Sequence, residues 1–502
     1  MIYKYYSNNR FYVYDMPTNN ILEVDKIVYD ILDSFVKQNI KDKGNIPLLQ
    51  DIEEKYQKKY EINNLRKAYN EIIDSRNKFG LFSFEKPKEL KMDIDYSDLE
   101  TRLQQLILNV SERCNMRCTY CVYSGKFKYE RTHGDKLMSI EVARSAIEYF
   151  LNRTIKSKLI SISFYGGEPL LNLPVIKESV YFAKLLYKKI GLNAELMFSL
   201  TTNGTLLNDM SIIEFLKENN FSLLISLDGP KKVHDKQRMF RSGLGTYDII
   251  LNNLKNIYKT NPDYYSKKIA FSSVMLPENV SEVLSYYKNN EYIKTSRRPN
   301  IAFTNFKNSA ILDKNEIILQ KTIFKRKFKD LRNKYKNMLI EEKVESPLFK
   351  AISAILNSYW FAIYYRNMKI MCDSLKPNGI CIPGLRRIFV SVSGNYYVCE
   401  KMGESYKIGN VFNGLDLAAI NGLIKQYIDI SKEDCLNCWA IRFCGACYVP
   451  ARRGDILDRK IKQMSFCEGQ RKILKSILKD YCEVIEKNPI QAQKYFGSMK
   501  LS

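Results

Sequence analysis

The sequence lacks features that would direct the chain to a membrane or out of the cell. Residues 1–16, MIYKYYSNNRFYVYDM, contain no apolar segment of the kind found in a secretory signal. No stretch approaches the ~20 apolar residues that a membrane-spanning helix needs. Internal repeats and low-complexity tracts are also missing. We therefore expect a cytoplasmic protein with no membrane partner.

Cysteine is missing from residues 1–113, although the chain contains 12 cysteines. Three of them fall within residues 114–121, and the other nine lie beyond residue 371. Thiols stay reduced in the cytoplasm, so this clustering needs an explanation other than disulfide bonds. Metal binding is the better interpretation.

Acidic residues are fewer than basic ones, which leaves a formal charge of +24 on 502 residues. Such a charge favours an acidic partner, either a peptide or a nucleic acid. The lysines are dispersed, and no nucleic-acid recognition motif accompanies them, so a nucleic-acid partner is not expected. The length suggests about three domains, and 45% hydrophobic residues can bury a sizeable core.

Residues 1–90 predict a small module of a β-hairpin followed by helices. The segment YKYYSNNRFYVYDM alternates polar and apolar residues and ends in a turn at 17–20. Further helices are expected over 47–58 and 63–79. The helix after the turn is expected to place five apolar residues on one face: Val24, Val28, Ile31, Leu32 and Phe35.

Residues 100–307 alternate strand-like and helical segments, which predicts a parallel α/β sheet forming a partial (β/α)6 barrel. The expected strands are 105–110, 159–166, 195–200, 222–228, 268–275 and 300–306. In such barrels the working residues lie on the loops that follow the strands. We interpret 308–370 as a Lys-rich, solvated helical connector, 371–482 as a cysteine-dense domain that relies on metal to fold, and 483–502 as a tail.

Three cysteines follow the first expected strand. The stretch SERCNMRCTYC places Cys114, Cys118 and Cys121 at C-x3-C-x2-C spacing. A four-iron cluster needs four ligands, so three thiols leave one iron open, much as an open position marks a catalytic zinc site. A three-cysteine zinc site is the competing interpretation.

Further motifs follow the next three expected strands: Tyr165-Gly166-Gly167-Glu168-Pro169, Thr201-Thr202-Asn203-Gly204 and Ser226-Leu227-Asp228-Gly229. The glycines would let the backbone approach a ligand closely. With the cysteines, this series resembles the radical S-adenosylmethionine (SAM) superfamily. The resemblance implies a [4Fe–4S] cluster on Cys114, Cys118 and Cys121, and SAM held by Tyr120, Tyr165, Gly166, Gly167, Glu168, Thr202, Asn203, Ser226, Asp228 and Arg238. We interpret His234 as a polar residue at a helix start, and no residue is assigned as a catalytic base.

Seven cysteines beyond residue 380 form a second pattern. CIPGLRRIFVSVSGNYYVC gives C-x12-G-x4-C spacing from Cys381 to Cys399, and CLNCWAIRFCGAC contains two C-x2-C pairs. Such pairs indicate zinc or iron–sulfur ligands, and a two-zinc ribbon is the competing interpretation. The pattern resembles the SPASM domain of peptide-modifying radical SAM enzymes, which implies two auxiliary [4Fe–4S] clusters. Cys435, Cys438, Cys444 and Cys467 would hold the distal one, and Cys381, Cys399 and Cys447 the one nearer SAM.

Two cysteines fall outside this division, and the pattern itself departs from the family at one point. The last pair, Cys444 and Cys447, has C-x2-C spacing where many family members have C-x3-C. Cys372 could complete the nearer cluster, or an iron there could stay open for a substrate thiolate. Cys482, in a helical stretch, is expected to be a buried structural thiol.

Residues 1–90 resemble the PqqD-like, winged-helix-like domain that binds leader peptides by strand addition. The whole layout resembles maturases that form Cys thioether bridges in ribosomally made peptides (sactipeptide or ranthipeptide type). The resemblance implies a precursor peptide with a leader and an electron donor such as flavodoxin or ferredoxin. Alternatives are carbon–carbon cross-linking or another peptide modification, formylglycine formation in a sulfatase, and a non-catalytic iron–sulfur electron carrier.

Overall fold

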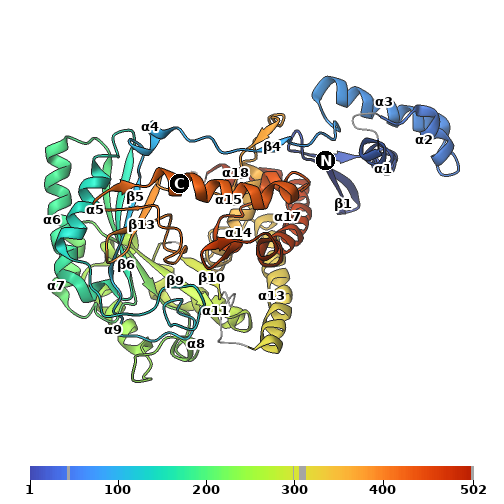
Figure 1. Cartoon of the computed structure of the whole chain (residues 1–502). Helices are drawn as coiled ribbons and strands as arrows, with labels where there is room; N and C mark the ends of the chain where they lie inside the picture. Colours follow the sequence, from blue (N-terminus) through green and yellow to red (C-terminus); the bar gives the residue numbers. More distant parts are fainter. Residues whose placement is uncertain (42–45, 298, 305–312, 499–502) are drawn as a thin grey trace.

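Six neighbouring parallel strands organise the middle of the chain (Figure 1). The computed structural model describes residues 1–41, 46–297, 299–304 and 313–498. The strands follow in sequence order: β5 (Gln105–Ser111), β6 (Leu159–Gly166), β7 (Glu195–Thr202), β8 (Ser222–Ser226), β9 (Ile269–Met275) and β10 (Asn300–Phe303). The predicted parallel sheet is confirmed, while residues 305 and 306 of its expected last strand lie outside the described residues.

Helices between the strands cover the outer face of this sheet (Figure 1). Ile160, Ile162 and Phe164 of β6 are fully or nearly fully buried toward them. The intervening side chains are small and polar, and Ser163 hydrogen-bonds Gln105 at 2.9 Å and Ser199 at 2.8 Å. The concave face therefore carries polar side chains on β6 and β7, beside an apolar group that includes Ile107 and Phe389. The main covering helices are α5 (Ile140–Leu151), α6 (Leu173–Ile190), α7 (Met210–Glu218), α9 (Tyr247–Thr260) and α11 (Val280–Asn289); short helices are α4 (Tyr96–Leu99), α10 (Pro262–Lys268), α12 (Glu291–Lys294), η1 (Pro169–Asn172) and η2 (Pro277–Asn279).

The C-terminal region extends the same sheet instead of standing apart from it. Strand β12 (Arg387–Val390) pairs parallel with β5. Three antiparallel strands continue outward: β13 (Asn395–Tyr397), β14 (Gly409–Asn410) and β15 (Gly414–Leu415). This region therefore shares the core of the barrel, which the sequence did not lead us to expect. Two small pairs lie elsewhere: β4 (Glu89–Leu90) with β11 (Ser374–Leu375), and β16 (Arg452–Arg453) with β17 (Ile456–Leu457).

The N-terminal module has three strands where a hairpin was expected. They are β1 (Ile2–Ser7), β2 (Arg10–Asp15) and β3 (Asn20–Val24), and α1 (Lys26–Lys41), α2 (Leu49–Tyr56) and α3 (Ile62–Phe79) follow. The placement of Val24 on the first helix was wrong, because this residue ends β3. The other four residues of the expected apolar face are buried in α1: Val28, Ile31, Leu32 and Phe35.

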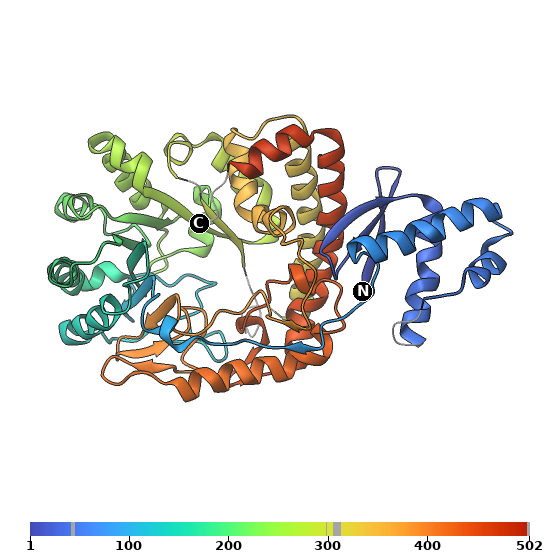
Figure 2. The same ribbon diagram turned by 90° about the horizontal axis from the view of Figure 1, so that it is seen from above.

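Both faces of this small sheet are covered. Val13 packs with the module's own helices, whereas the neighbouring Tyr12 and Tyr14 belong to the main core. On that second face, Tyr3 stacks on Trp439 with 4.3 Å between ring centroids. Figure 2 shows the module at one end of the molecule, beside α17 (Glu468–Lys487). Side chains that alternate along a strand such as β2 therefore pack against the module's own helices on one face and against the main core on the other.

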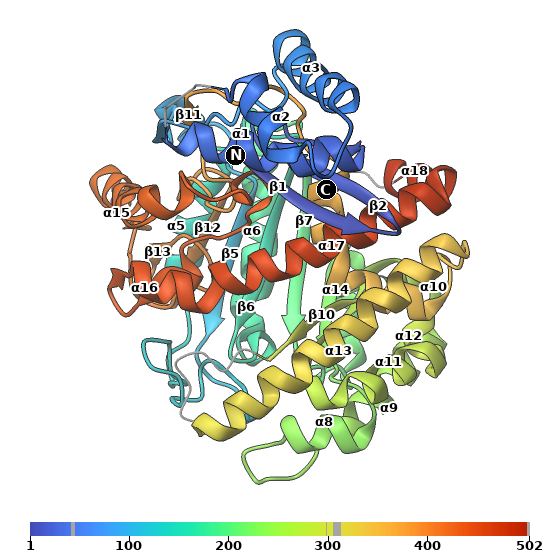
Figure 3. The ribbon, with the colours of Figure 1, turned by 90° about the vertical axis from the view of Figure 1, so that its right-hand side faces the viewer.

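Two expectations for the C-terminal half were wrong. The connector is helical, but neither of its helices is simply solvated: α13 (Lys314–Ile340) buries Tyr335 and Leu339 on one face, and α14 (Pro347–Tyr364) buries Trp360 and seven other side chains. The expected tail forms the end of α17 and α18 (Pro489–Gly497), which Figure 3 shows beside each other. Phe496 of α18 stacks on Trp360. Residues 308–312 and 499–502 lie outside the described residues. Although α14 is apolar, no helix in the described ranges has the length and apolarity needed to cross a membrane.

Arg442 joins the module to the C-terminal region. Its guanidinium donates to the carbonyls of Met16 and Pro17, and to those of Asn367 and Lys369, at 2.8–3.2 Å. Replacing Arg442 by Ala should weaken docking of the module by about 2–3 kcal/mol, because the charged donor is lost. Limited proteolysis between residues 85 and 95 should then be faster, whereas Arg453→Ala, at an exposed arginine, serves as the matched control. Equal cleavage rates in both variants would contradict this role.

Candidate functional site

The motifs found in the sequence meet at one edge of the parallel sheet. The cysteine loop follows β5, residues 166–168 follow β6, Thr202 and Asn203 end β7, and Asp228 follows β8. Because parallel strands run in the same direction, these loops all lie at their carboxyl ends. The fold thus brings together segments that are more than 100 residues apart in the chain.

The cysteine loop lies directly against the two glycines. Gly167 N donates to Ser111 O at 2.7 Å, and Glu168 N donates to Arg113 O at 2.8 Å. A Cβ on Gly167 would lie 2.3 Å from Arg113 O, and Gly166 has φ +151° with its Cβ position 2.4 Å from Ser111 O. Glycine is needed here so that two backbone segments can touch. Our expectation that these glycines serve the approach of a ligand is therefore extended to the packing of the cysteine loop.

Glu168, just after β6, connects the loop that follows β5 with the end of β7. Its side chain is fully buried and accepts hydrogen bonds from Thr202 Oγ1 at 2.8 Å and from Asn203 N at 2.7 Å. Burial raises the pKa of this carboxyl. Asn203 in turn donates to Asn115 Oδ1 at 2.8 Å, between the first two cysteines. These contacts hold the loops of the predicted SAM site in place.

A buried chain of polar groups runs beside the cysteines. Arg238 donates to Tyr120 Oη at 2.7 Å, and Tyr120 donates to Asp228 Oδ2 at 2.6 Å. Asp228 is fully buried, which raises the pKa of its carboxyl, and its second oxygen accepts from Val274 N at 3.0 Å. Arg238 Nε is buried and has no hydrogen-bond partner among the described residues. This donor fits an acceptor supplied from outside the chain, such as the carboxylate of SAM.

His234 contacts the backbone of Asp228, a member of this chain of polar groups. It lies within α8 (Lys231–Gln237) and is fully buried, not at an exposed helix start. Its Nδ1 accepts from Asp228 N at 3.3 Å, and its Nε2 lies 3.0 Å from Thr246 Oγ1. Burial lowers the pKa of His234 to about 3, so the ring is neutral. Its contacts are structural, but its buried position inside the helix differs from the helix-start position that we expected.

The three thiols Cys114, Cys118 and Cys121 are close neighbours. Burial raises the pKa of Cys114 to about 11 and that of Cys121 to about 12, and each is affected by Cys118. The positive charge of Arg238 acts in the opposite direction on all three. Metal binding would replace these thiol protons. Three half-buried thiols beside an unpartnered Arg238 donor fit a four-iron cluster with one open iron and a chelating ligand that carries a carboxylate.

Two expected SAM contacts have less distinctive surroundings. Tyr165 presents its ring edge-on to Phe389 of β12, with 6.5 Å between centroids. Ser226 ends β8, and its backbone is paired with Ser272 of β9. Tyr165 lies on β6, whose end contacts the cysteine loop. Ser226 lies two residues before Asp228, a member of the buried chain of polar groups.

Sequence reasoning missed two residues that surround the cysteine loop. His133 Nε2 lies 3.8 Å from Cys121 Sγ. Arg131 is buried, donates to the carbonyls of Glu400 and Gly403, and stacks over Phe389 at 4.0 Å. Both belong to a loop without a recognisable motif, so only their positions in the fold identify them.

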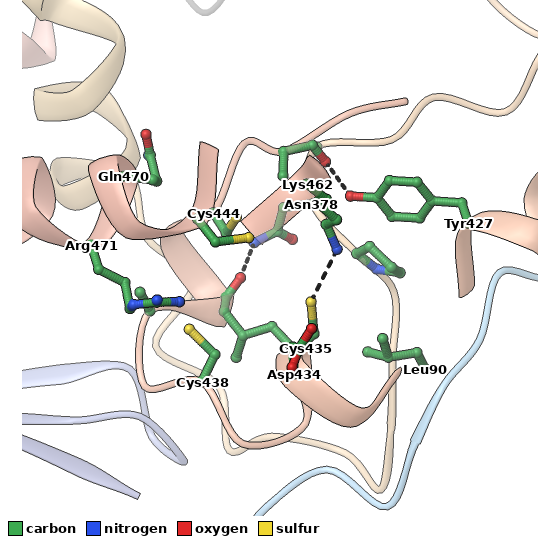
Figure 4. Close-up of a pocket in the computed structure, with 16 residues that line it drawn as sticks. Leu90, Asn378, Tyr427, Asp434, Cys435, Cys438, Cys444, Lys462, Gln470 and Arg471 are labelled. Atoms are coloured by element: carbon green, nitrogen blue, oxygen red, sulfur yellow. Dashed lines mark hydrogen bonds between the residues drawn. The ribbon is translucent and has the colours of Figure 1, made fainter. Parts of the chain in front are cut away.

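Four C-terminal cysteines line one cavity, whose empty volume is about 570 Å³ including space open to solvent (Figure 4). Cys435 ends α15 (Leu417–Cys435), Cys438 follows in a turn, Cys444 follows η3 (Ile441–Phe443), and Cys467 ends the π-helical turn η5 (Gln463–Cys467). These are the four residues predicted to hold the distal cluster. In the described residues no three Cys, His, Asp or Glu side chains are placed to hold a single metal ion.

The remaining predicted ligands form a second group. The Cys381 and Cys447 thiols both act on the pKa of Cys399, which burial raises to about 11. Gly394, at φ +79°, turns the β12–β13 hairpin that precedes Cys399. Cys372 is exposed and neighbours Arg442 at the N-terminal module. Cys482 is buried, 3.2 Å from Tyr5 Oη, as expected of a structural thiol.

Residues 108–288 match the family model described as Radical SAM superfamily. Along 472 residues the chain is 27% identical to the radical SAM cyclopropyl synthase TigE of Paramaledivibacter caminithermalis, covering 90% of this chain and 89% of that protein. It is also 27% identical over 191 residues to a cysteine-type anaerobic sulfatase-maturating enzyme of Clostridium novyi. That match covers 38% of this chain and 49% of the enzyme, so the chain spans about half the length of this relative.

A solved structure has a similar fold. That of anSMEcpe with bound AdoMet and the Kp18Cys peptide superposes with a TM-score of 0.53 at 21% identity. The match covers 79% of this chain and 100% of the other. The likeness supports the α/β architecture with its central parallel sheet.

Replacing Cys114, Cys118 and Cys121 together by Ala should remove one cluster of about four iron atoms. It should also abolish reductive cleavage of SAM to 5′-deoxyadenosine, because no iron would remain at this first site to chelate SAM. The C-terminal thiols line separate sites and should keep their iron. Iron analysis and chromatography of the anaerobically reconstituted protein would measure both effects. Loss of all iron in this variant would contradict separate sites.

Proposed function

We propose that this chain, whose residues 108–288 form a radical SAM domain, modifies a ribosomally made precursor peptide. The observation that carries the proposal is the meeting of three thiols with the buried Arg238–Tyr120–Asp228 chain at the sheet edge. Together they supply cluster ligands and a donor for the carboxylate of SAM. An electron carrier would need the thiols but not this polar chain.

When bound, the clusters would supply the electron that cleaves SAM to methionine and a 5′-deoxyadenosyl radical, and would accept the electron left after substrate coupling. The protein's own residues position and shield the reactants. Arg238 and Asp228 are both held in fixed orientations by Tyr120. On the concave face, the hydrogen-bonded hydroxyls of Ser163 and Ser199 could also contact a bound peptide.

The bond we favour is a thioether between a peptide cysteine and a carbon of the same peptide. Cys381, Cys399 and Cys447 form a group of three thiols, which would leave one iron open to bind a substrate thiolate. In the balanced reaction the carbon loses a hydrogen atom to the adenosyl radical and the thiol loses its proton. The remaining electron goes to the nearer auxiliary cluster.

Carbon–carbon bond formation is the second candidate. It is favoured by the similarity to a cyclopropyl synthase, which extends over 90% of this chain. Formylglycine formation is supported by the match to sulfatase-maturating enzymes, which is limited to 38% of the chain.

The N-terminal module is proposed to bind the leader of the precursor. Strand β1 packs beside α17, where Tyr5 contacts Cys482 and Ser7 donates to Lys479 O. Strand β3 lies at the opposite edge of the three-stranded sheet and pairs only with β2 among the described strands. An extended peptide could add to this edge through main-chain hydrogen bonds, and the +24 charge of the chain would attract an acidic leader.

Co-expression with a cysteine-containing small peptide encoded beside the gene tests the reaction. Each new bond should lower the peptide mass by two hydrogens, because one leaves the carbon and one leaves its partner. Alkylation with iodoacetamide then separates the candidates: a thioether removes one reactive thiol per bond, whereas a carbon–carbon bond leaves the thiols reactive. The variant lacking Cys114, Cys118 and Cys121 is the control. An unchanged peptide mass while SAM is cleaved would argue against this substrate.

Two proline substitutions in the full chain test the leader site. Successive N–H groups along β3 point alternately toward β2 and toward the open edge, so Ile21→Pro and Leu22→Pro differ in which one they remove. One variant should lose about 1–3 kcal/mol of stability through a broken ladder bond. The other should keep its thermal stability but bind the leader at least tenfold more weakly, as measured by fluorescence anisotropy. Unchanged affinity in the stable variant would refute strand addition at this edge.

A further inference from the structure

The cavity lined by Cys435, Cys438, Cys444 and Cys467 contains a buried lysine (Figure 4). Lys462 is 3% exposed and is the one lysine among the buried residues that the structure describes. Its Nζ donates to Ser431 Oγ at 2.5 Å and to Cys435 Sγ at 3.4 Å. The ammonium also lies 4.6 Å from the centroid of the Tyr427 ring.

An irregular turn directs Lys462 into this cavity. The residue ends α16 (Arg459–Lys462) and is followed by the π-helical turn that ends at Cys467. Five residues along an α-helix would place two side chains about 140° apart around the axis. A π turn closes hydrogen bonds between residues i and i+5 and therefore brings such residues to one side. Lys462 and Cys467 both line the cavity for this reason.

The ammonium of Lys462 forms no ion pair with a carboxylate among the described residues, although Asp434, whose pKa is lowered by its hydrogen bonds from Arg459, is near enough for the charge of Lys462 to lower that pKa further. Asp434 also lines the cavity, but its two oxygens accept from Arg459 at 2.8 and 2.7 Å. Within the described residues, no carboxylate lies within ion-pair distance of Lys462 Nζ. A buried ammonium without a counter-charge is costly, and neither the Ser431 hydroxyl nor the Tyr427 ring carries a full negative charge. The position therefore fits a negatively charged occupant of the cavity.

We infer that Lys462 is a positioning residue that orients the Cys435 thiolate and raises the reduction potential of the iron–sulfur cluster bound by these four cysteines. The inference rests on the proposed ligand set. The reduced form of a cluster carries one more negative charge than the oxidised form. A fixed cation and an N–H donor directed at a ligand sulfur stabilise the reduced form more, because potentials depend on nearby charge and on hydrogen bonds to sulfur.

Redox titration of the anaerobically reconstituted full chain, followed by electron paramagnetic resonance, tests this role. Lys462→Met should lower the ratio of reduced to oxidised cluster about tenfold at the wild-type midpoint, a shift equivalent to about 59 mV for one electron. Lys462→Arg keeps the charge and should stay near the wild-type value. Ser431→Ala removes a partner of the lysine but not the charge, so it is the matched control.

Iron analysis of the same samples distinguishes the possible failures. If Lys462→Met does not keep its iron, the inference is tested instead by comparing the reduction potentials of Lys462→Gln and Lys462→Arg. Both variants retain a donor, and they differ in charge. Equal potentials in that pair, or an unchanged potential in iron-replete Lys462→Met, would overturn the inference while leaving the ligand set intact. Full iron content in a Cys435→Ala, Cys438→Ala double variant would instead overturn the ligand set, and the inference with it.

Discussion

The backbone of residues 111–113 lies against that of residues 166–168, close enough for two amide-to-carbonyl hydrogen bonds. No side chain could be placed at Gly167 without meeting Arg113 O. From this contact, Glu168 reaches the end of β7, and Asn203 returns to Asn115 in the cysteine loop. A closed set of backbone and side-chain contacts thus holds the loop that carries the thiols.

Both proposed cofactor sites contain buried charged side chains whose pairing is incomplete. Arg238 and Asp228 share Tyr120, so each has a partner, although Arg238 Nε keeps one free donor within the described structure. Lys462 has a hydroxyl, a thiol and an aromatic ring around it. Burying such groups is costly unless they are paired. Their incomplete pairing is explained if anionic ligands complete both sites.

The three parts of the chain are joined more closely than their composition suggests. Strand β12 continues the barrel sheet beside β5, and Arg131, from the loop after the first cysteines, donates to Gly403 O across the same boundary. Trp439, beside Cys438 in the proposed distal site, packs on Tyr3 of the N-terminal module. Binding of a leader to that module would therefore take place on an element that contacts the loop of the distal cysteines.

The sequence by itself determined the parallel sheet, the positions of its strands and the cysteine sets, because these depend on local periodicity and on short motifs with fixed spacing. It could not show that β12 joins the barrel or that Tyr12 and Val13 face different cores, since both outcomes depend on partners distant in the chain. The third strand at 20–24 was missed because its apolar spacing also suits a helix. Only the tertiary structure placed Lys462 and His133 beside thiols, because neither residue belongs to a motif and each meets its cysteine through a loop or an irregular helical turn.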